Sequence, residues 1–148
     1  MLDPQAIKDN YLVTGLTDEQ LGCIAELAEE RTVDQGEVLC REGERGEDLY
    51  IVIDGMFDVK IGGEVLAQVG PSTVIGEMGL IEPRPRSASV EAVRTSHVAA
   101  INQRELRLTL IENGDLGFLV LCNVARLLSE RLRHADGKLA ALMGAAVD

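Results

Sequence analysis

Residues 76–90, GEMGLIEPRPRSASV, place a carboxylate, an arginine and small hydroxyl side chains within one short segment. The glycine at its start permits close approach of the backbone, and EMGLI is long enough for one helical turn whose free N–H groups attract an anion. Arg86 supplies a cation, while Ser87 and Ala88 add a hydroxyl and exposed backbone donors. These groups together predict a phosphate site.

Glu77 restricts what that phosphate can belong to. A carboxylate close to a phosphate repels it, so Glu77 should face a hydrogen-bond donor such as a sugar hydroxyl. Glu77 and Arg86 therefore indicate a ligand with both a phosphate and a ribose hydroxyl. On chemistry alone a second reading stays open, in which the two side chains form an exposed ion pair across a turn.

The elements that must position this segment begin with a helix. Thr17 can cap a helix over residues 17–31, because Leu21, Ile24 and Leu27 fall on one face. Short β-rich runs then alternate with Asp-Gly and Gly-Gly turn signals, at spacings of about ten residues. The expected strands lie at 38–41, 49–53, 56–61, 64–69, 87–93 and 96–101. This spacing predicts an antiparallel sandwich or barrel, because a parallel sheet would need crossover helices.

After residue 101 the apolar period becomes helical. Asn102 with Glu105 forms a capping-box arrangement for a helix that should break at Asn113-Gly114. Asp115 is the expected cap of a second helix, which should end near Ala135 or Gly137. An apolar stripe on it, Leu116, Val120, Val124 and Leu127, is expected to pack on the barrel or on another subunit.

The order of these motifs closely resembles a known family. IGEMGLIEPRPRSASVEA is similar to the phosphate-binding cassette of the cyclic nucleotide-binding domain family, and VLCREGERGEDLYIVIDGMFDVKI to the glycine-punctuated strands of the same family. The resemblance covers about residues 16–133. It implies a mainly β fold, an eight-stranded antiparallel β-roll with one N-terminal and two C-terminal helices. Residues 1–148 would form a single domain, divided into an N-terminal helical segment (1–31), the roll (32–101) and lid helices (102–137).

The resemblance also implies a role for each site residue. Glu77 would accept a hydrogen bond from the ribose 2′-hydroxyl, and Arg86 would neutralise the cyclic phosphate with help from the Ser87 hydroxyl and backbone N–H groups. The last helix would cover the base as a lid. Arg84 misses the family spacing and is a weaker phosphate candidate. The expected ligand-binding residues are Gly76, Glu77, Met78, Gly79, Arg86, Ser87, Ala88, Arg131, Leu132 and Arg133.

The expected function is therefore a regulatory sensor. It would bind cAMP, with cGMP as the alternative because the Ser87 hydroxyl could meet a guanine amino group, and would move its C-terminal helices to signal to an unidentified effector protein. A homodimer stays open. The rival reading is a ligand-free scaffold or interaction domain of the same fold. About fifteen residues follow the last helix expected, too few for a helix-turn-helix domain.

Composition narrows the remaining classes of function. The net charge of −11, from 14 basic and 25 acidic residues, disfavours binding to nucleic acid or to anionic membranes. Three separated cysteines and two histidines offer no metal-ligand or catalytic spacing, so neither a metal, a cofactor nor an enzyme activity is expected. Without an apparent signal peptide or an apolar segment of membrane-spanning length, the chain reads as cytoplasmic.

Overall fold

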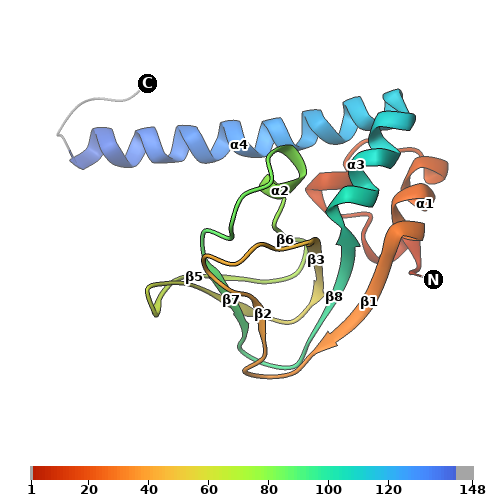
Figure 1. The fold of residues 1–148 in the computed structure, drawn as a ribbon. Helices are drawn as coiled ribbons and strands as arrows, with labels where there is room; N and C mark the ends of the chain where they lie inside the picture. Colours follow the sequence, from red (N-terminus) through yellow and green to blue (C-terminus); the bar gives the residue numbers. More distant parts are fainter. Residues whose placement is uncertain (1, 143–148) are drawn as a thin grey trace.

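Two four-stranded antiparallel sheets form a roll (Figure 1) in a computed structural model that describes residues 2–142. One sheet has the order β1-β8-β3-β6 and the other β2-β7-β4-β5. The strands are β1 (Ala28–Val33), β2 (Val38–Cys40), β3 (Asp48–Asp54), β4 (Phe57–Ile61), β5 (Glu64–Val69), β6 (Val74–Ile75), β7 (Ser89–Ala92) and β8 (Ser96–Asn102). This arrangement confirms the predicted eight-stranded antiparallel β-roll.

Helices lie at one end of the roll. They are α1 (Asp18–Leu27), α2 (Met78–Ile81), α3 (Gln103–Glu112) and α4 (Gly114–Leu142), preceded by the 3-10 turns η1 (Pro4–Ala6) and η2 (Tyr11–Val13). Figure 1 shows α4 extending across the end of the roll beyond α2. One N-terminal and two C-terminal helices were predicted, and the single turn α2 lies within the segment that the sequence marked as a phosphate site.

The first predicted helix is too long at its C-terminal end. It ends at Leu27, and the next residues form β1, which pairs with β8 from Ala28 opposite Ile101 to Val33 opposite Ser96. Ordinary residue types differ in helix propensity by only about a few tenths of a kcal/mol per residue. The hydrogen bonds between β1 and β8 therefore outweigh the preference of Glu29 and Glu30 for a helix. The short strand β6 was also not predicted, because two residues carry no readable alternation.

The second C-terminal helix differs from its prediction at both ends. Asn113, not Asp115, acts as the cap, because its Oδ1 accepts a hydrogen bond from the Leu116 N–H at 3.3 Å. The helix also continues through Gly137 to Leu142 instead of stopping near Ala135. Glycine terminates a helix when it takes a left-handed conformation, and Gly137 keeps a helical backbone.

The apolar stripe of α4 packs on its own domain. Leu116, Val120 and Val124 have no exposed surface and belong to one core with residues of η2, α1 and α3, while Leu127 is half-buried. Asn123 lies within this buried face, and its Nδ2 donates to the carbonyl oxygens of Leu12 at 3.0 Å and Thr14 at 2.9 Å. The first half of α4 is thereby fixed to the N-terminal segment.

Replacing Asn123 tests this attachment. Asn123→Ala should lower the free energy of unfolding by about 2 kcal/mol, because the buried Leu12 carbonyl and the partly buried Thr14 carbonyl lose their donor. Urea unfolding followed by circular dichroism would measure it. Glu130→Ala, at an exposed position of the same helix, is the control and should change stability by less than about 0.5 kcal/mol. Equal effects of the two variants would contradict the attachment.

Candidate functional site

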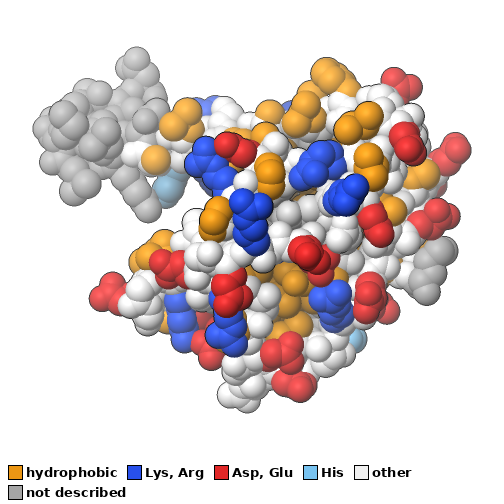
Figure 2. All heavy atoms as spheres, viewed as in Figure 1, with side chains coloured by type: hydrophobic (Ala, Val, Ile, Leu, Met, Phe, Trp, Pro, Cys, Tyr) orange, Lys and Arg blue, Asp and Glu red, His pale blue; other side chains and the backbone are white. Residues whose placement is uncertain are grey.

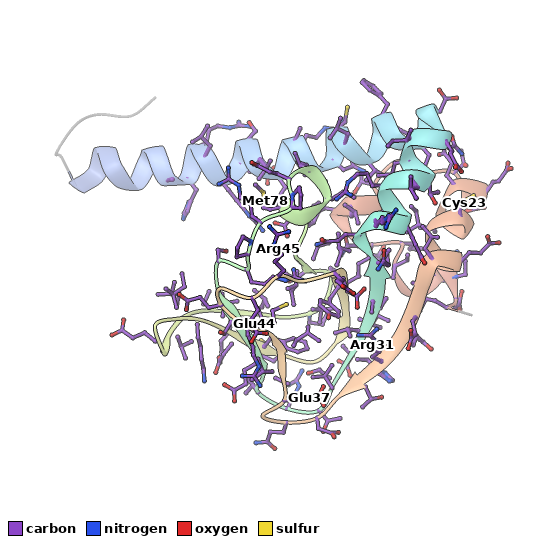
Figure 3. All side chains as sticks on the ribbon, viewed as in Figure 1. Cys23, Arg31, Glu37, Glu44, Arg45 and Met78 are labelled. Carbon is purple, nitrogen blue, oxygen red and sulfur yellow. The ribbon has the colours of Figure 1, made fainter. Side chains whose placement is uncertain are left out.

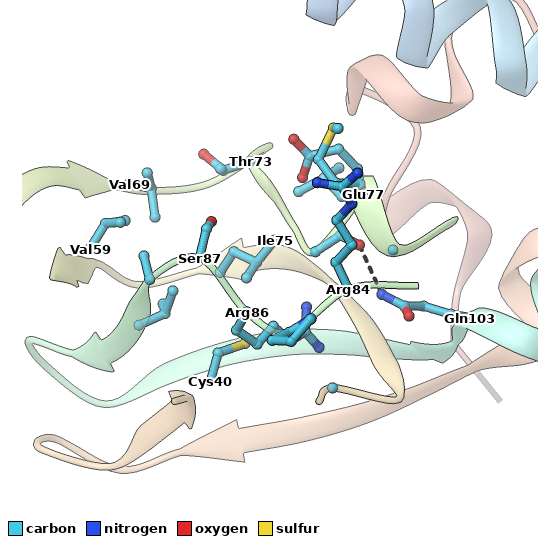
Figure 4. A pocket seen from close by; sticks show the side chains of 18 of the residues that line it. Cys40, Val59, Val69, Thr73, Ile75, Glu77, Arg84, Arg86, Ser87 and Gln103 are labelled. Carbon is cyan, nitrogen blue, oxygen red and sulfur yellow. Dashed lines mark hydrogen bonds between the residues drawn. The ribbon is translucent and has the colours of Figure 1, made fainter. Parts of the chain in front are cut away.

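A cavity of about 520 Å³ lies between the roll, α2 and α4 (Figure 4). Eight of the ten predicted ligand-binding residues line it. They are Gly76, Glu77, Met78, Gly79, Arg86, Ser87, Ala88 and Arg131. In Figure 3, Met78 on α2 lies close to α4. Since α4 is far from the cassette in the sequence, only the fold brings Arg131 to these residues.

The backbone around Gly76 sets the direction of Glu77. Gly76 has φ +89°, a left-handed conformation that favours glycine, and the chain then turns into α2 with Leu80 N–H donating to the Glu77 carbonyl at 3.1 Å. Glu77 stands at the start of α2, but its side chain makes no capping hydrogen bond to the helix. Its carboxylate is therefore available to another partner.

That partner is Arg131 on α4. The guanidinium Nη1 of Arg131 donates to Oε1 of Glu77, and the Glu77 side chain is only 6% exposed while that of Arg131 is 52% exposed. The ion pair thus closes over the cavity from the α4 side. It replaces the alternative in which Glu77 and Arg86 simply neutralise each other across a turn.

Arg86 is held from the opposite side. Its Nη2 donates to the carbonyl oxygen of Asp48 at the start of β3, and its own backbone N–H donates to Glu44 O at 2.8 Å. The guanidinium lies where a Cβ atom on Gly46 or Gly76 would be, so these two glycines form the slot that contains it. A half-buried cation is the result, directed along the wall of the cavity.

Leu132 and Arg133 do not reach the cavity. Successive residues of an α-helix point about 100° apart, so only one of three consecutive side chains can face the cassette. Leu132 is 63% exposed, and Arg133 donates to the Ser129 hydroxyl of its own helix at 3.3 Å. The lid predicted from residues 131–133 is therefore reduced to Arg131 in this structure.

Arg84 lines the same cavity but is engaged elsewhere. Its Nη2 donates to Oε1 of Glu82 at 2.8 Å, and this hydrogen bond raises the pKa of the Arg84 guanidinium above its ordinary value. The side chain is 73% exposed, so the pair is a surface contact of the loop. Arg86, by contrast, is half-buried and fixed at both its backbone and its guanidinium.

One end of the cavity was not anticipated from the sequence. Figure 4 shows Val59, Val69 and Ser87 at the end opposite Gln103. Thr73 and Cys40 also line the wall, and burial raises the pKa of the Cys40 thiol, which keeps it neutral near pH 7. Val59 and Val69 belong to strands whose inward alternation could have identified them once the cassette was placed. The end they form is apolar with two hydroxyls at its edge.

Two side chains of α3 hold the cassette in place and were also missed. Gln103 Nε2 donates to Gly76 O at 2.9 Å, and Arg107 donates from Nε to Leu80 O at 3.2 Å and from Nη2 to Gly79 O at 3.0 Å. The two residues are four apart and thus share one face of the helix, a spacing that was legible in the sequence. These contacts connect α2 to α3 directly.

Tyr11 places an unpaired hydroxyl beneath this region. Among the described residues, its hydroxyl is the buried side-chain polar atom without a hydrogen-bond partner. Burial raises the pKa of Tyr11 far above its ordinary value, and the negative charge of Glu77 raises it further. The hydroxyl therefore stays protonated near pH 7.

An unpaired buried hydroxyl should cost stability. Tyr11→Phe should raise the free energy of unfolding by about 0.5–1 kcal/mol, because the phenyl ring keeps the packing and removes an unsatisfied polar atom. Thermal and urea unfolding measure the change. Tyr50→Phe is the matched control, since the Tyr50 hydroxyl is not a buried polar atom without a hydrogen-bond partner, and this variant should not gain stability. A loss of stability in Tyr11→Phe would show that the hydroxyl has a partner.

Two other kinds of feature were sought over the described part of the chain. No group of three or more His, Cys, Asp or Glu side chains there comes together in a way that could hold a metal ion. Within residues 2–142, no helix combines the length and apolarity that crossing a bilayer requires.

Comparison with known proteins adds a family match. The family model described as "Cyclic nucleotide-binding domain" matches residues 30–113. The chain is 36% identical over 135 residues to the cyclic AMP receptor protein of Thermus thermophilus, covering 88% of this chain and 61% of that protein. It is 25% identical over 110 residues to the type II regulatory subunit of the cAMP-dependent protein kinase of Drosophila melanogaster, covering 74% of this chain and 29% of the subunit.

A solved structure shares the architecture. A cyclic nucleotide-binding domain from Methylobacillus flagellatus superposes with a TM-score of 0.78 at 25% identity, covering 97% of this chain and 83% of that one. The chain spans less than two thirds of both the Thermus receptor and the Drosophila subunit. By their names, one of these relatives is a receptor for cyclic AMP and the other a regulatory subunit.

Proposed function

Since this chain belongs to the cyclic nucleotide-binding domain family, we propose that its cavity binds a cyclic nucleotide, cAMP before cGMP, and that binding is signalled to a partner protein. The observation that carries the proposal is the arrangement of Glu77 and Arg86. Both face one cavity, and each is held by a different part of the fold. A cation and a carboxylate kept apart in this way match a ligand that has a phosphate and a hydroxyl.

The dimensions and chemistry of the cavity support a nucleotide. Small-ligand sites measure roughly 300–1,000 Å³, and this cavity measures about 520 Å³. Arg86 would bind the phosphate together with the backbone N–H groups near Ala88. The ion pair of Glu77 uses Oε1, so the proposal assigns Oε2 to the ribose 2′-hydroxyl.

The apolar end of the cavity would receive the base. Val59 and Val69 offer aliphatic contact, and the chain has no Trp to stack on a purine. The hydroxyls of Ser87 and Thr73 stand at this end as donors or acceptors for the edge of the base. One hydroxyl can serve either purine, which is why cGMP is retained as a competitor of cAMP.

The signalling part of the proposal follows the connections of the cassette. A ligand that binds Glu77 and Arg86 would favour one position of α2, which Gln103 and Arg107 join to α3 and Glu77 joins to α4. Such a ligand can shift the position of the C-terminal helices only through its differential affinity for the two states. The proposed activity is thus regulation of an effector, with the cytoplasm as the proposed location.

Calorimetric titration with cAMP and with cGMP tests the site. Arg86→Ala should weaken binding by about 100-fold, because a charge-assisted contact to phosphate is worth about 1.5–3 kcal/mol. The substitution also leaves the space beside Gly46 and Gly76 without the guanidinium that fills it. Arg84→Ala is the matched control two residues away, and its affinity should change by less than about threefold, since Arg84 pairs with Glu82 at the surface.

The results divide clearly. Binding to wild type that survives in Arg84→Ala and collapses in Arg86→Ala supports the assignment, provided that circular dichroism shows both variants folded. Absence of heat with either nucleotide would favour the scaffold reading of the fold. Equal losses of affinity in the two arginine variants would contradict the assignment of the phosphate to Arg86.

Arg131 gives a second test on α4. Arg131→Ala should weaken cAMP binding by about tenfold, because the negative charge of the nearly buried Glu77 carboxylate then has no cationic partner and repels the ligand phosphate. Arg133→Ala, whose guanidinium contacts only its own helix, should change affinity by less than about twofold. If Arg133→Ala had the larger effect, the lid would contact the ligand through a different face of α4.

A further inference from the structure

Tyr11 is a buried polar side chain for which neither the fold nor the proposed site has a use. Within residues 2–142, its hydroxyl is the buried side-chain atom that lacks a hydrogen-bond partner. The residue stands in η2 and packs against the core that α1, α3 and α4 share. Buried tyrosine hydroxyls usually have a partner. This one is therefore a donor that is available to any neighbouring group that loses its own partner.

The charged neighbours of the Tyr11 hydroxyl are Glu77 and Arg131. Burial is the largest cause of the raised pKa of Tyr11, the carboxylate of Glu77 raises it further, and the guanidinium of Arg131 lowers it. Because Coulomb interactions weaken with distance, the hydroxyl lies near the ion pair that closes the cavity. It is bonded to neither member of that pair in this structure.

The position of Tyr11 does not depend on the part of α4 that carries Arg131. Asn10 is 2% exposed. Its Nδ2 donates to a backbone carbonyl in the turn between β5 and β6 at 2.8 Å, and its Oδ1 accepts from the Leu12 N–H at 2.9 Å. Asn123 donates to the Leu12 carbonyl at 3.0 Å, and it precedes Arg131 by about 12 Å of helix. Tyr11 is thus fixed on both sides by contacts that a movement of Arg131 leaves intact.

Glu77, in contrast, depends on a partner that faces solvent. Its side chain is 6% exposed, whereas that of Arg131 is 52% exposed. The helix α2 gives the carboxylate no capping hydrogen bond. A nearly buried carboxylate without a donor costs free energy. When Arg131 turns to water, Glu77 therefore needs another donor.

The nearby cations are poor substitutes. Figure 2 shows Lys and Arg side chains on one face of the molecule, along the boundary between α4 and the roll. Arg86 already donates to the Asp48 carbonyl, and Arg107 donates to backbone carbonyls of α2. Either guanidinium would leave its acceptors without a donor by turning to Glu77. The Tyr11 hydroxyl gives up no hydrogen bond when it does so.

We propose that Tyr11 is the second partner of Glu77, whose carboxylate accepts a hydrogen bond from the Tyr11 O–H whenever Arg131 leaves it. Tyr11 is then a positioning residue, because it acts through Glu77 and does not itself line the cavity. Its consequence for nucleotide rests on the proposed function. The N-terminal segment would keep Glu77 directed to the ribose while α4 is still open, so that the ligand can bind before the lid closes.

A double-mutant cycle followed by thermal unfolding without nucleotide tests the exchange of partners. In wild type, Tyr11→Phe should raise Tm by about 2 °C, because it removes an unpaired buried hydroxyl. In the Arg131→Ala background, the same substitution should lower Tm by about 2–4 °C, because Glu77 then loses its remaining donor. Tyr50→Phe is the matched control. The pKa of Tyr50 is raised by burial and by neighbours that do not include Glu77, so this variant should shift Tm equally in both backgrounds.

Removing the acceptor makes the test specific. When Glu77→Ala is added to Arg131→Ala, Tyr11→Phe should again raise Tm, since the hydroxyl has lost its new partner. An identical shift from Tyr11→Phe in wild type and in Arg131→Ala would overturn the proposal. So would a reversal of sign that persists without Glu77.

Calorimetric titration with cAMP tests the consequence for the ligand. Tyr11→Phe should change the affinity of wild type by less than about twofold, and should weaken that of Arg131→Ala by about tenfold, as expected for the loss of a hydrogen bond to a carboxylate. Equal effects in the two backgrounds would overturn this role. A reversal of the Tm shift in a protein that binds no cyclic nucleotide would support Tyr11 as the partner of Glu77 and contradict the proposed function alone.

Discussion

Glu77 and Arg86 carry opposite charges, lie nine residues apart and line the same cavity, so the site depends on keeping them from neutralising each other. The fold does this by giving each a separate partner. Arg86 donates to a backbone carbonyl of β3, and Glu77 accepts from an arginine of α4. A direct ion pair between them would fill the cavity with its own charges and leave neither for a ligand.

The means by which each charge is held are of different kinds. Arg86 lies in a slot that exists because Gly46 and Gly76 have no side chains, and the sheet fixes its carbonyl acceptor. Its position is therefore set by contacts with β3 and the two glycines. Glu77 depends on Arg131, whose side chain is half-exposed and stands on a helix that packs tightly only in its first half. The Arg86 side of the cavity is held by the sheet, whereas the Glu77 side depends on where α4 lies.

Under the proposed function, this asymmetry assigns the signal to the helices. Gln103 and Arg107 hold the cassette to α3 through backbone carbonyls, so α2 and α3 share one set of contacts. Beyond Asn123, which fixes α4 to the N-terminal segment, the described contacts of α4 to its own domain become few. The part of α4 that closes the cavity through Arg131 is thus the part with few other contacts to the domain.

Most strands and helix starts could be predicted from the sequence, because they depend on residues that are close together in the chain. Turn dipeptides and alternating strands predicted six strands of an antiparallel sandwich or barrel, and Thr17 and Asn102 predicted two helix starts. The resemblance of the segment around Glu77 and Arg86 to a family cassette added the eight-stranded roll and the identity of the site. The tertiary structure alone decided the contacts between distant segments. It turned Ala28–Val33 into a strand by pairing it with β8, chose Arg131 over its two neighbours by the rotation of a helix, and brought Gln103 to Gly76. Local chemistry is set by neighbours in the chain, whereas a partner from another element depends on packing that no single segment encodes.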